Sequence, residues 1–201
     1  MWAPEPTNTT TAAPPVTAAP VLTNGTCSCG KRNVATRIVG GEYTETNEYP
    51  WQVALVSSGR SHPWCGGTLI SSRHILTAAH CTAGESPSSM AVLLGEHRIS
   101  DDKFDRRSLS AITDHPKYKR KTLDNDFSIL TLSEPVTFTD KISPACLPGN
   151  GSQDYIGMKA IVSGWGTTSS GGNQPNKLKD VEVTVQSNDQ CNQAYGGEIT
   201  R

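Results

Sequence analysis

The chain has 201 residues, a formal net charge of −1 at pH 7, and 18% charged residues. This balance argues against a basic nucleic-acid or membrane-binding surface, so we expect no nucleic-acid and no membrane partner. The longest purely apolar run, residues 90–94, has five residues, far too few for a transmembrane helix. Frequent glycine and proline, without apolar residues at every third or fourth position, also disfavour a helical bundle.

The first segment, residues 1–26, predicts no folded structure. Between Ala3 and Pro20, 15 of 18 residues are alanine, proline or threonine, which offer almost nothing to bury. We interpret the segment as a disordered linker, with an O-glycosylated stalk as the alternative.

Six cysteines are spread along the chain, at positions 27, 29, 65, 81, 146 and 191. Cys27 and Cys29 are one residue too close for the usual zinc-binding pair, and the five histidines form no His-x-x-x-His, so a zinc site is disfavoured. Widely spaced cysteines instead indicate disulfides formed in an oxidising compartment. Three N-glycosylation sequons, which begin at Asn8, Asn24 and Asn150, favour the same secreted, extracellular location.

From about Ile38 onward the pattern predicts an all-β protein. Apolar and polar residues alternate in two segments, and short apolar runs lie between turn clusters; these are residues 51–55 and 181–185, and residues 68–70, 91–94, 127–132 and 160–162. Many short strands joined by glycine-rich turns indicate a sandwich or a barrel. One short helix is expected after Val185, where Ser187 and Gln190 have the spacing of a capping box.

Six motifs in this part of the chain occur in a familiar order. They are Thr36-Arg37-Ile38-Val39-Gly40-Gly41, Tyr49-Pro50-Trp51, Cys65-Gly66-Gly67-Thr68-Leu69-Ile70, Thr77-Ala78-Ala79-His80-Cys81, Asp124-Asn125-Asp126-Phe127-Ser128-Ile129-Leu130 and Gly164-Trp165-Gly166. Together they resemble the trypsin-like, chymotrypsin-fold serine endopeptidases from Cys29 to about Arg201, and the region before Ile38 resembles invertebrate zymogens. The resemblance implies a double β-barrel, with the first barrel complete and the second partial.

The resemblance implies that His80 is the general acid and base and that Asp126 orients it. A serine hydroxyl is a poor nucleophile, so a histidine must accept its proton while a carboxylate fixes the histidine tautomer. The separation of 46 positions from His80 to Asp126 agrees with roughly 45 in the general template of this triad. Asp124 is the nearest alternative, but Asp126 directly precedes the apolar run. Phe127 departs from the aliphatic residue usual in the family.

We assign no serine nucleophile. The template places the serine roughly 90 residues after the aspartate, whereas 75 residues follow Asp126 and no Gly-Asp-Ser-Gly-Gly or Gly-x-Ser-x-Gly occurs. We therefore expect a C-terminally truncated peptidase domain, residues 38–201, that is inactive as given. The alternative is a non-catalytic protease homologue that acts as a binding or adaptor protein; the retained His80 and Asp126 favour the protease.

The resemblance further implies a propeptide, residues 27–37, that is cut between Arg37 and Ile38 by a protease of tryptic specificity. The new amino group of Ile38 would insert into the body and pair with a carboxylate beside the catalytic serine. The substrates would be proteins or peptides, and no cofactor is implied.

The family pattern pairs Cys65 with Cys81, and Cys29 with Cys146. For Cys27 two alternatives stay open: a bond to Cys191, or an unpaired or intermolecular cysteine. The segment Gly95-Glu96-His97 resembles the start of a calcium loop, but Arg98 and Lys103 fall where oxygen ligands would be needed. We therefore expect no metal.

Overall fold

The computed structural model describes residues 28–33, 43–100, 104–149, 155–167, 169, 171–197 and 199. The elements, in chain order, are β1 (Gln52–Ser57), β2 (Pro63–Leu69), β3 (His74–Thr77), α1 (Ala79–Thr82), β4 (Met90–Leu94), β5 (Asp105–Asp114), β6 (Ser128–Leu132), β7 (Lys159–Gly164), β8 (Lys179–Thr184) and α2 (Asn188–Ala194).

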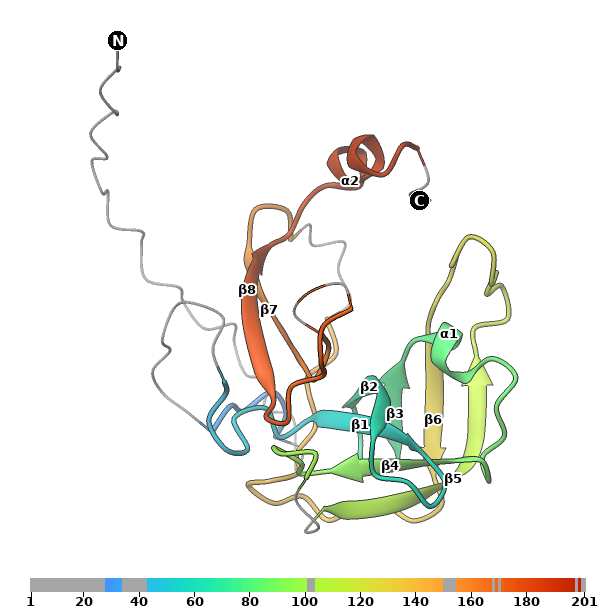
Figure 1. Cartoon of the computed structure of the whole chain (residues 1–201), viewed down its shortest axis with the longest axis vertical. Helices are drawn as coiled ribbons and strands as arrows, with labels where there is room; N and C mark the ends of the chain where they lie inside the picture. Colours follow the sequence, from blue (N-terminus) through green and yellow to red (C-terminus); the bar gives the residue numbers. More distant parts are fainter. Residues whose placement is uncertain are drawn as a thin grey trace, which may run out of the picture.

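Six of the strands close into a barrel in the order β1-β2-β3-β6-β5-β4, and every neighbouring pair is antiparallel. Strands β7 and β8 form a separate antiparallel pair beside the barrel, followed by α2 (Figure 1). The all-β chymotrypsin-like fold, with a complete first barrel and a partial second one, is thus confirmed.

The core has two layers because successive side chains of a strand point to opposite faces. In β1, Val53 and Leu55 belong to the cluster inside the barrel, together with side chains of β4 and β6. Ala54 and Val56 belong to a second cluster, which includes Trp165. Strand β1 is therefore buried on both faces, and this double burial explains its nearly continuous apolar sequence.

The two helices differ in how well the sequence predicts them. Helix α2 starts as expected: the Ser187 hydroxyl accepts a hydrogen bond from the Gln190 backbone, and the Gln190 side chain accepts one from the Ser187 backbone, both at 3.1 Å. Helix α1 has four residues and is preceded by Ala78, which has no capping side chain, so no sequence signal marks it. Neither helix in the described part of the chain has the length and apolar character to cross a membrane.

Candidate active site

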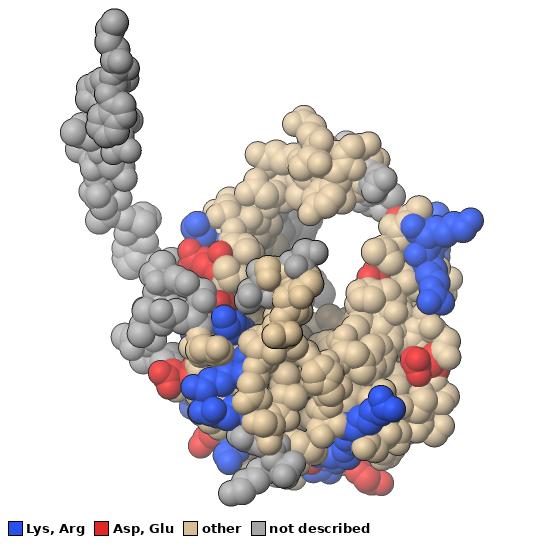
Figure 2. Space-filling view, viewed as in Figure 1, with Lys and Arg blue, Asp and Glu red and all other residues tan. Residues whose placement is uncertain are grey.

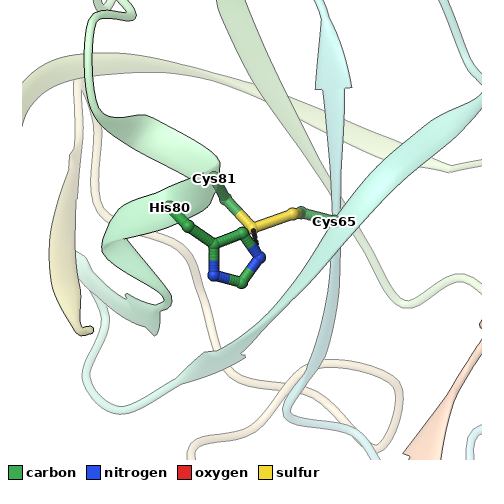
Figure 3. Close-up of side chains that lie close together, drawn as sticks. All are labelled: Cys65, His80 and Cys81. Carbon is green, nitrogen blue, oxygen red and sulfur yellow. Dashed lines mark hydrogen bonds between the residues drawn. A yellow bond between two sulfur atoms is a disulfide. The ribbon is translucent and has the colours of Figure 1, made fainter. Parts of the chain in front are cut away.

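Two connections hold the short helix α1 against the barrel. Cys81 is joined by a disulfide to Cys65 of β2. The Thr82 hydroxyl donates a hydrogen bond of 2.5 Å to the carboxylate of Asp114, the last residue of β5. His80 directly precedes these two anchoring residues in α1 and is drawn beside the disulfide in Figure 3. The helix therefore holds His80 at a fixed position at the end of the barrel.

The pairing of β3 with β6 brings Asp126 to His80. Thr77 of β3 pairs with Ser128 of β6, so the chain that leaves β3 and the chain that enters β6 are neighbours. Asp126 precedes this pair by two residues, and His80 follows it by three. The backbone N–H of Phe127 donates to the carbonyl of Asn125 at 2.8 Å and holds the turn that presents Asp126.

The Asp126 carboxylate contacts His80 through both of its oxygens. Oδ1 accepts the backbone N–H of His80 at 2.7 Å, and Oδ2 lies 2.7 Å from His80 Nδ1. An ionised carboxylate only accepts hydrogen bonds, so Nδ1 carries a proton and, in the neutral ring, Nε2 bears the lone pair. Nε2 lies 3.4 Å from Cys81 Sγ, but this disulfide sulfur has no proton to donate, so the lone pair stays available. The His80 side chain is 52% exposed, which leaves the ring accessible to a reacting group.

The environment of Asp126 lowers the pKa of its carboxyl. Burial is the largest single influence and raises the pKa, but hydrogen bonds from the His80 side chain and backbone, the charge of His80 and the Ala79 backbone N–H together outweigh it. Asp126 is therefore ionised at neutral pH, as a group that must stabilise a protonated histidine has to be.

Asp124, the alternative to Asp126, has a different partner. Its Oδ2 lies 3.3 Å from Lys119 Nζ, and the backbone of Lys119 donates to the carbonyl of Asp124 at 3.0 Å. The structure thus brings Asp126 to His80 and gives Asp124 a role in closing the loop between β5 and β6.

The structure contains a second disulfide, between Cys29 and Cys146, with Cα atoms 5.0 Å apart. Both bonds have the partners that the family resemblance implies. Cys191 is a free thiol. Cys27, Arg37 and Ile38 lie outside the described residues, so the expected activation site is not described.

Two groups invite a metal interpretation. Cys65, His80 and Cys81 place their ligand atoms within 4.8 Å of one another, but both sulfurs are in the disulfide drawn in Figure 3 and offer no thiolate. In the calcium-like segment, Glu96 is 7% exposed, and its Oε1 accepts the backbone N–H groups of His97 and Arg98. Among the residues that the structure describes, neither arrangement presents a free set of ligands.

Two further features follow no pattern that the sequence reveals. Ser163 of β7 donates a hydrogen bond of 2.7 Å to Gln52 of β1; the two residues line a cavity of about 210 Å³ between the barrel and the β7–β8 pair. The Tyr49 hydroxyl donates to the Asp180 carboxylate of β8. Burial and this hydrogen bond raise the pKa of Tyr49 well above its usual range. These contacts join the two regions on either side of the site.

Comparisons with known proteins agree with this geometry. The trypsin family model matches residues 38–201. The chain is 33% identical to the proclotting enzyme of Tachypleus tridentatus over 96% of this chain and 55% of the relative. It is 38% identical to the serine protease filzig of Drosophila melanogaster over 79% of this chain and 10% of the relative. It is 35% identical to the serine proteinase stubble of the same species over 83% of this chain and 22% of the relative.

A solved structure of mouse neuropsin, a serine protease expressed in the limbic system of the brain, superposes with a TM-score of 0.71 at 32% identity. The match covers 82% of this chain and 72% of neuropsin. The chain spans about half the length, or less, of the curated relatives above. The sequence match, the closed barrel and the structural neighbour lead to one conclusion. The chain belongs to the trypsin family of serine proteases.

Proposed function

We propose that this chain is part of a secreted trypsin-like endopeptidase in its zymogen form. It would hydrolyse peptide bonds in proteins or peptides after cleavage between Arg37 and Ile38 by a protease of tryptic specificity, without a cofactor. Residues 1–26 form a linker, residues 27–37 a propeptide, and residues 38–201 the peptidase domain. The observation that carries the proposal is the pair of 2.7 Å contacts between His80 and Asp126.

In the proposed reaction, His80 Nε2 accepts the proton of a serine hydroxyl as that serine attacks the substrate carbonyl. The proton then passes from Nε2 to the leaving amine, so His80 acts first as a base and then as an acid. Asp126 keeps the proton on Nδ1, which leaves Nε2 free to accept, and its charge stabilises the imidazolium formed in between.

The nucleophile is not assigned to any of the 201 residues. Ser163, a serine near the barrel, donates its hydroxyl to Gln52 and is a structural residue. We therefore propose that the 201-residue polypeptide does not hydrolyse peptides and is not labelled by a serine-directed fluorophosphonate. Clear labelling of this polypeptide, abolished by His80→Ala, would show that one of its own serines is the nucleophile and would contradict the proposal.

A decisive test of protease against non-catalytic homologue is the coding sequence beyond codon 201. A protease requires a serine in a Gly-Asp-Ser-Gly-Gly context, whereas glycine or another residue at that serine would support a binding or adaptor protein. We expect serine, because His80 and Asp126 are both present and in contact.

The packing of residues 28–33 supports the zymogen part of the proposal. Cys29 is bonded to Cys146, the Gly30 N–H donates to the Pro144 carbonyl at 2.8 Å, and Arg32 forms an ion pair with Glu48. The Arg32 guanidinium also lies 5.1 Å from the centre of the Tyr49 ring. A propeptide held in this way would stay attached after cleavage at Arg37.

Limited digestion with trypsin tests this zymogen arrangement. We expect a new N-terminus that begins Ile38-Val39-Gly40-Gly41, and a propeptide that separates from the rest on a gel only after reduction. In the matched Cys146→Ser variant the propeptide should separate without reduction. Release of the propeptide from the unsubstituted chain under non-reducing conditions, or cleavage elsewhere before Arg37 is cut, would contradict the proposal.

A further inference from the structure

The loop between β5 and β6 carries an unusual concentration of positive charge. Four of the five residues from position 117 to position 121 are basic, and all four are exposed: Lys117, Lys119, Arg120 and Lys121. Figure 2 shows blue side chains gathered over this loop, at the edge of the hollow that separates it from the region of α2. The same loop ends at Asp126, so the charges lie on the segment that presents the proposed catalytic carboxylate.

Within the described part of the chain, most of this charge has no acidic partner. Lys119 is paired with Asp124, whose side chain is only 13% exposed. The other nearby carboxylate, Asp126, is engaged by His80. Across the ranges that the structure describes, Lys117, Arg120 and Lys121 form no ion pair. We call these three residues the basic rim.

The loop is held at its base, so the basic rim occupies a defined place. The backbone of Lys119 pairs with that of Asp124, and the side chain of Asn125 donates to the Lys117 carbonyl at 3.2 Å. Arg120 and Lys121 therefore lie in the tip that projects beyond this closure. The tip also holds Leu123, which is 52% exposed and offers an apolar contact beside the charges.

We propose that the basic rim binds an acidic segment of the protein substrate next to the active site. Uncompensated charges at the edge of a binding region attract opposite charge, speed association and select among partners. The rim is confined to one loop of a chain whose net charge is −1, which fits a short acidic peptide better than a long polyanion such as nucleic acid. That the partner is a substrate rests on the proposed function; the binding itself does not require catalysis.

The test measures peptide binding by the 201-residue chain. A fluorescein-labelled dodecapeptide rich in glutamate, and a matched peptide with glutamine at the same positions, are titrated with the chain and followed by fluorescence anisotropy at low and high salt. We expect the glutamate peptide to bind with a Kd that rises with salt, and the glutamine peptide to bind at least about tenfold more weakly, because the charge attraction is lost.

The charge of the basic rim is then reversed in the triple variant Lys117→Glu, Arg120→Glu and Lys121→Glu. The control carries the same charge change at three exposed residues outside the loop, and its substitutions are Arg60→Glu, Arg73→Glu and Lys141→Glu. The rim variant should raise the Kd of the glutamate peptide at least about tenfold, and the control should raise it less than about threefold, because only nearby charges escape screening. Circular dichroism checks that both variants fold.

Three results would overturn the proposal: no binding of the glutamate peptide, an equal loss in both triple variants, or binding of a heparin fragment in place of the peptide. None of these results bears on hydrolysis. If the basic rim binds the acidic peptide but the complete protein lacks a catalytic serine, the interaction surface stands and the endopeptidase proposal fails.

Discussion

The strands of the closed barrel and those of the β7–β8 pair both carry large aliphatic side chains, but in very different environments. In β1, Val53 and Leu55 are completely buried, whereas in β8 Val181 is 46% exposed and Val183 is 39% exposed. Each barrel strand has a neighbour on both sides. Within the described residues, β7 and β8 pair only with each other apart from one bridge between Tyr43 and Lys179. Hydrophobicity alone therefore does not determine burial; the number of neighbouring strands does.

The largest difference between the two regions should appear when an apolar side chain is shortened. Leu130→Ala in β6 removes a fully buried side chain and should lower the free energy of unfolding by about 2–5 kcal/mol. Val183→Ala in β8 shortens a side chain that is 39% exposed, so we expect a much smaller change, within about 0.5 kcal/mol. Urea unfolding followed by circular dichroism measures both. Equal losses would show that β8 is buried in solution.

Hydrogen exchange should show the same contrast without a substitution. Backbone amides of β1 and β4 lie between two strands and within the core, so they should exchange only through global unfolding. Amides of β7 and β8 should exchange through local opening, with protection factors at least about tenfold lower. Uniform protection across all eight strands would contradict the expected difference in stability between the barrel and the β7–β8 pair.

The exposed face of β7–β8 should also govern solubility. Val162 and Val181 face each other across the pair, and Val162 is 56% exposed. Exposed apolar strands with free edges promote association between copies. Val181→Lys should raise the concentration at which the chain aggregates while changing the free energy of unfolding by less than about 0.5 kcal/mol. Light scattering measures the aggregation; unchanged aggregation would indicate that another surface drives it.

The smallest expected effect concerns pH. Because the pKa of Asp126 is lower in the folded chain than its ordinary value of 3.8, its ionised form stabilises the fold at higher pH. This contribution is fully present above 3.8 and is lost as the pH falls through the lowered pKa. We expect Asp126→Asn to cost about 1 kcal/mol or less at neutral pH, since the contact to His80 is partly exposed to solvent.

Unfolding measured across the acidic range checks this sign. The difference between the unsubstituted chain and Asp126→Asn should shrink as the pH falls. Asp140→Asn, at an exposed position in the segment after β6, is the matched control for the substitution itself. A difference that grows toward low pH would contradict the lowered pKa of Asp126.

The sequence predicts the strands whose apolar pattern is strong and misses those whose pattern is weak. Strands β1, β4, β6, β7 and β8 match the alternating segments and apolar runs, and α2 matches its capping box. Strand β5 was not predicted, because Leu109 is its one buried residue and its other side chains are half-buried or exposed. Its place in the sheet comes from its pairing with β4 and β6, which local sequence does not encode.

The candidate site was predicted by a different kind of sequence signal from the one that predicted the strands. His80 and Asp126 were found through the family motifs, not through hydrophobic periodicity, and the order of the strands explains why two residues 46 positions apart meet. Phe127, expected to start the strand, precedes β6 and is 46% exposed; the centres of its ring and the His115 ring are 4.5 Å apart, with the rings tilted by 44°. The link between Thr82 and Asp114 had no sequence signal, because it depends on how β5 ends beside α1.

The most direct test of the catalytic roles proposed for His80 and Asp126 is to compare kcat of the complete, activated protein with and without the His80 side chain. In the proposed reaction His80 moves the proton in every step, so His80→Ala should lower kcat by roughly 10⁴-fold or more, the scale of such losses in serine proteases. KM should change little, because His80 acts on the transition state and not on substrate binding. A His80→Ala variant with near-normal kcat would contradict the assignment of His80 and Asp126 as the catalytic pair.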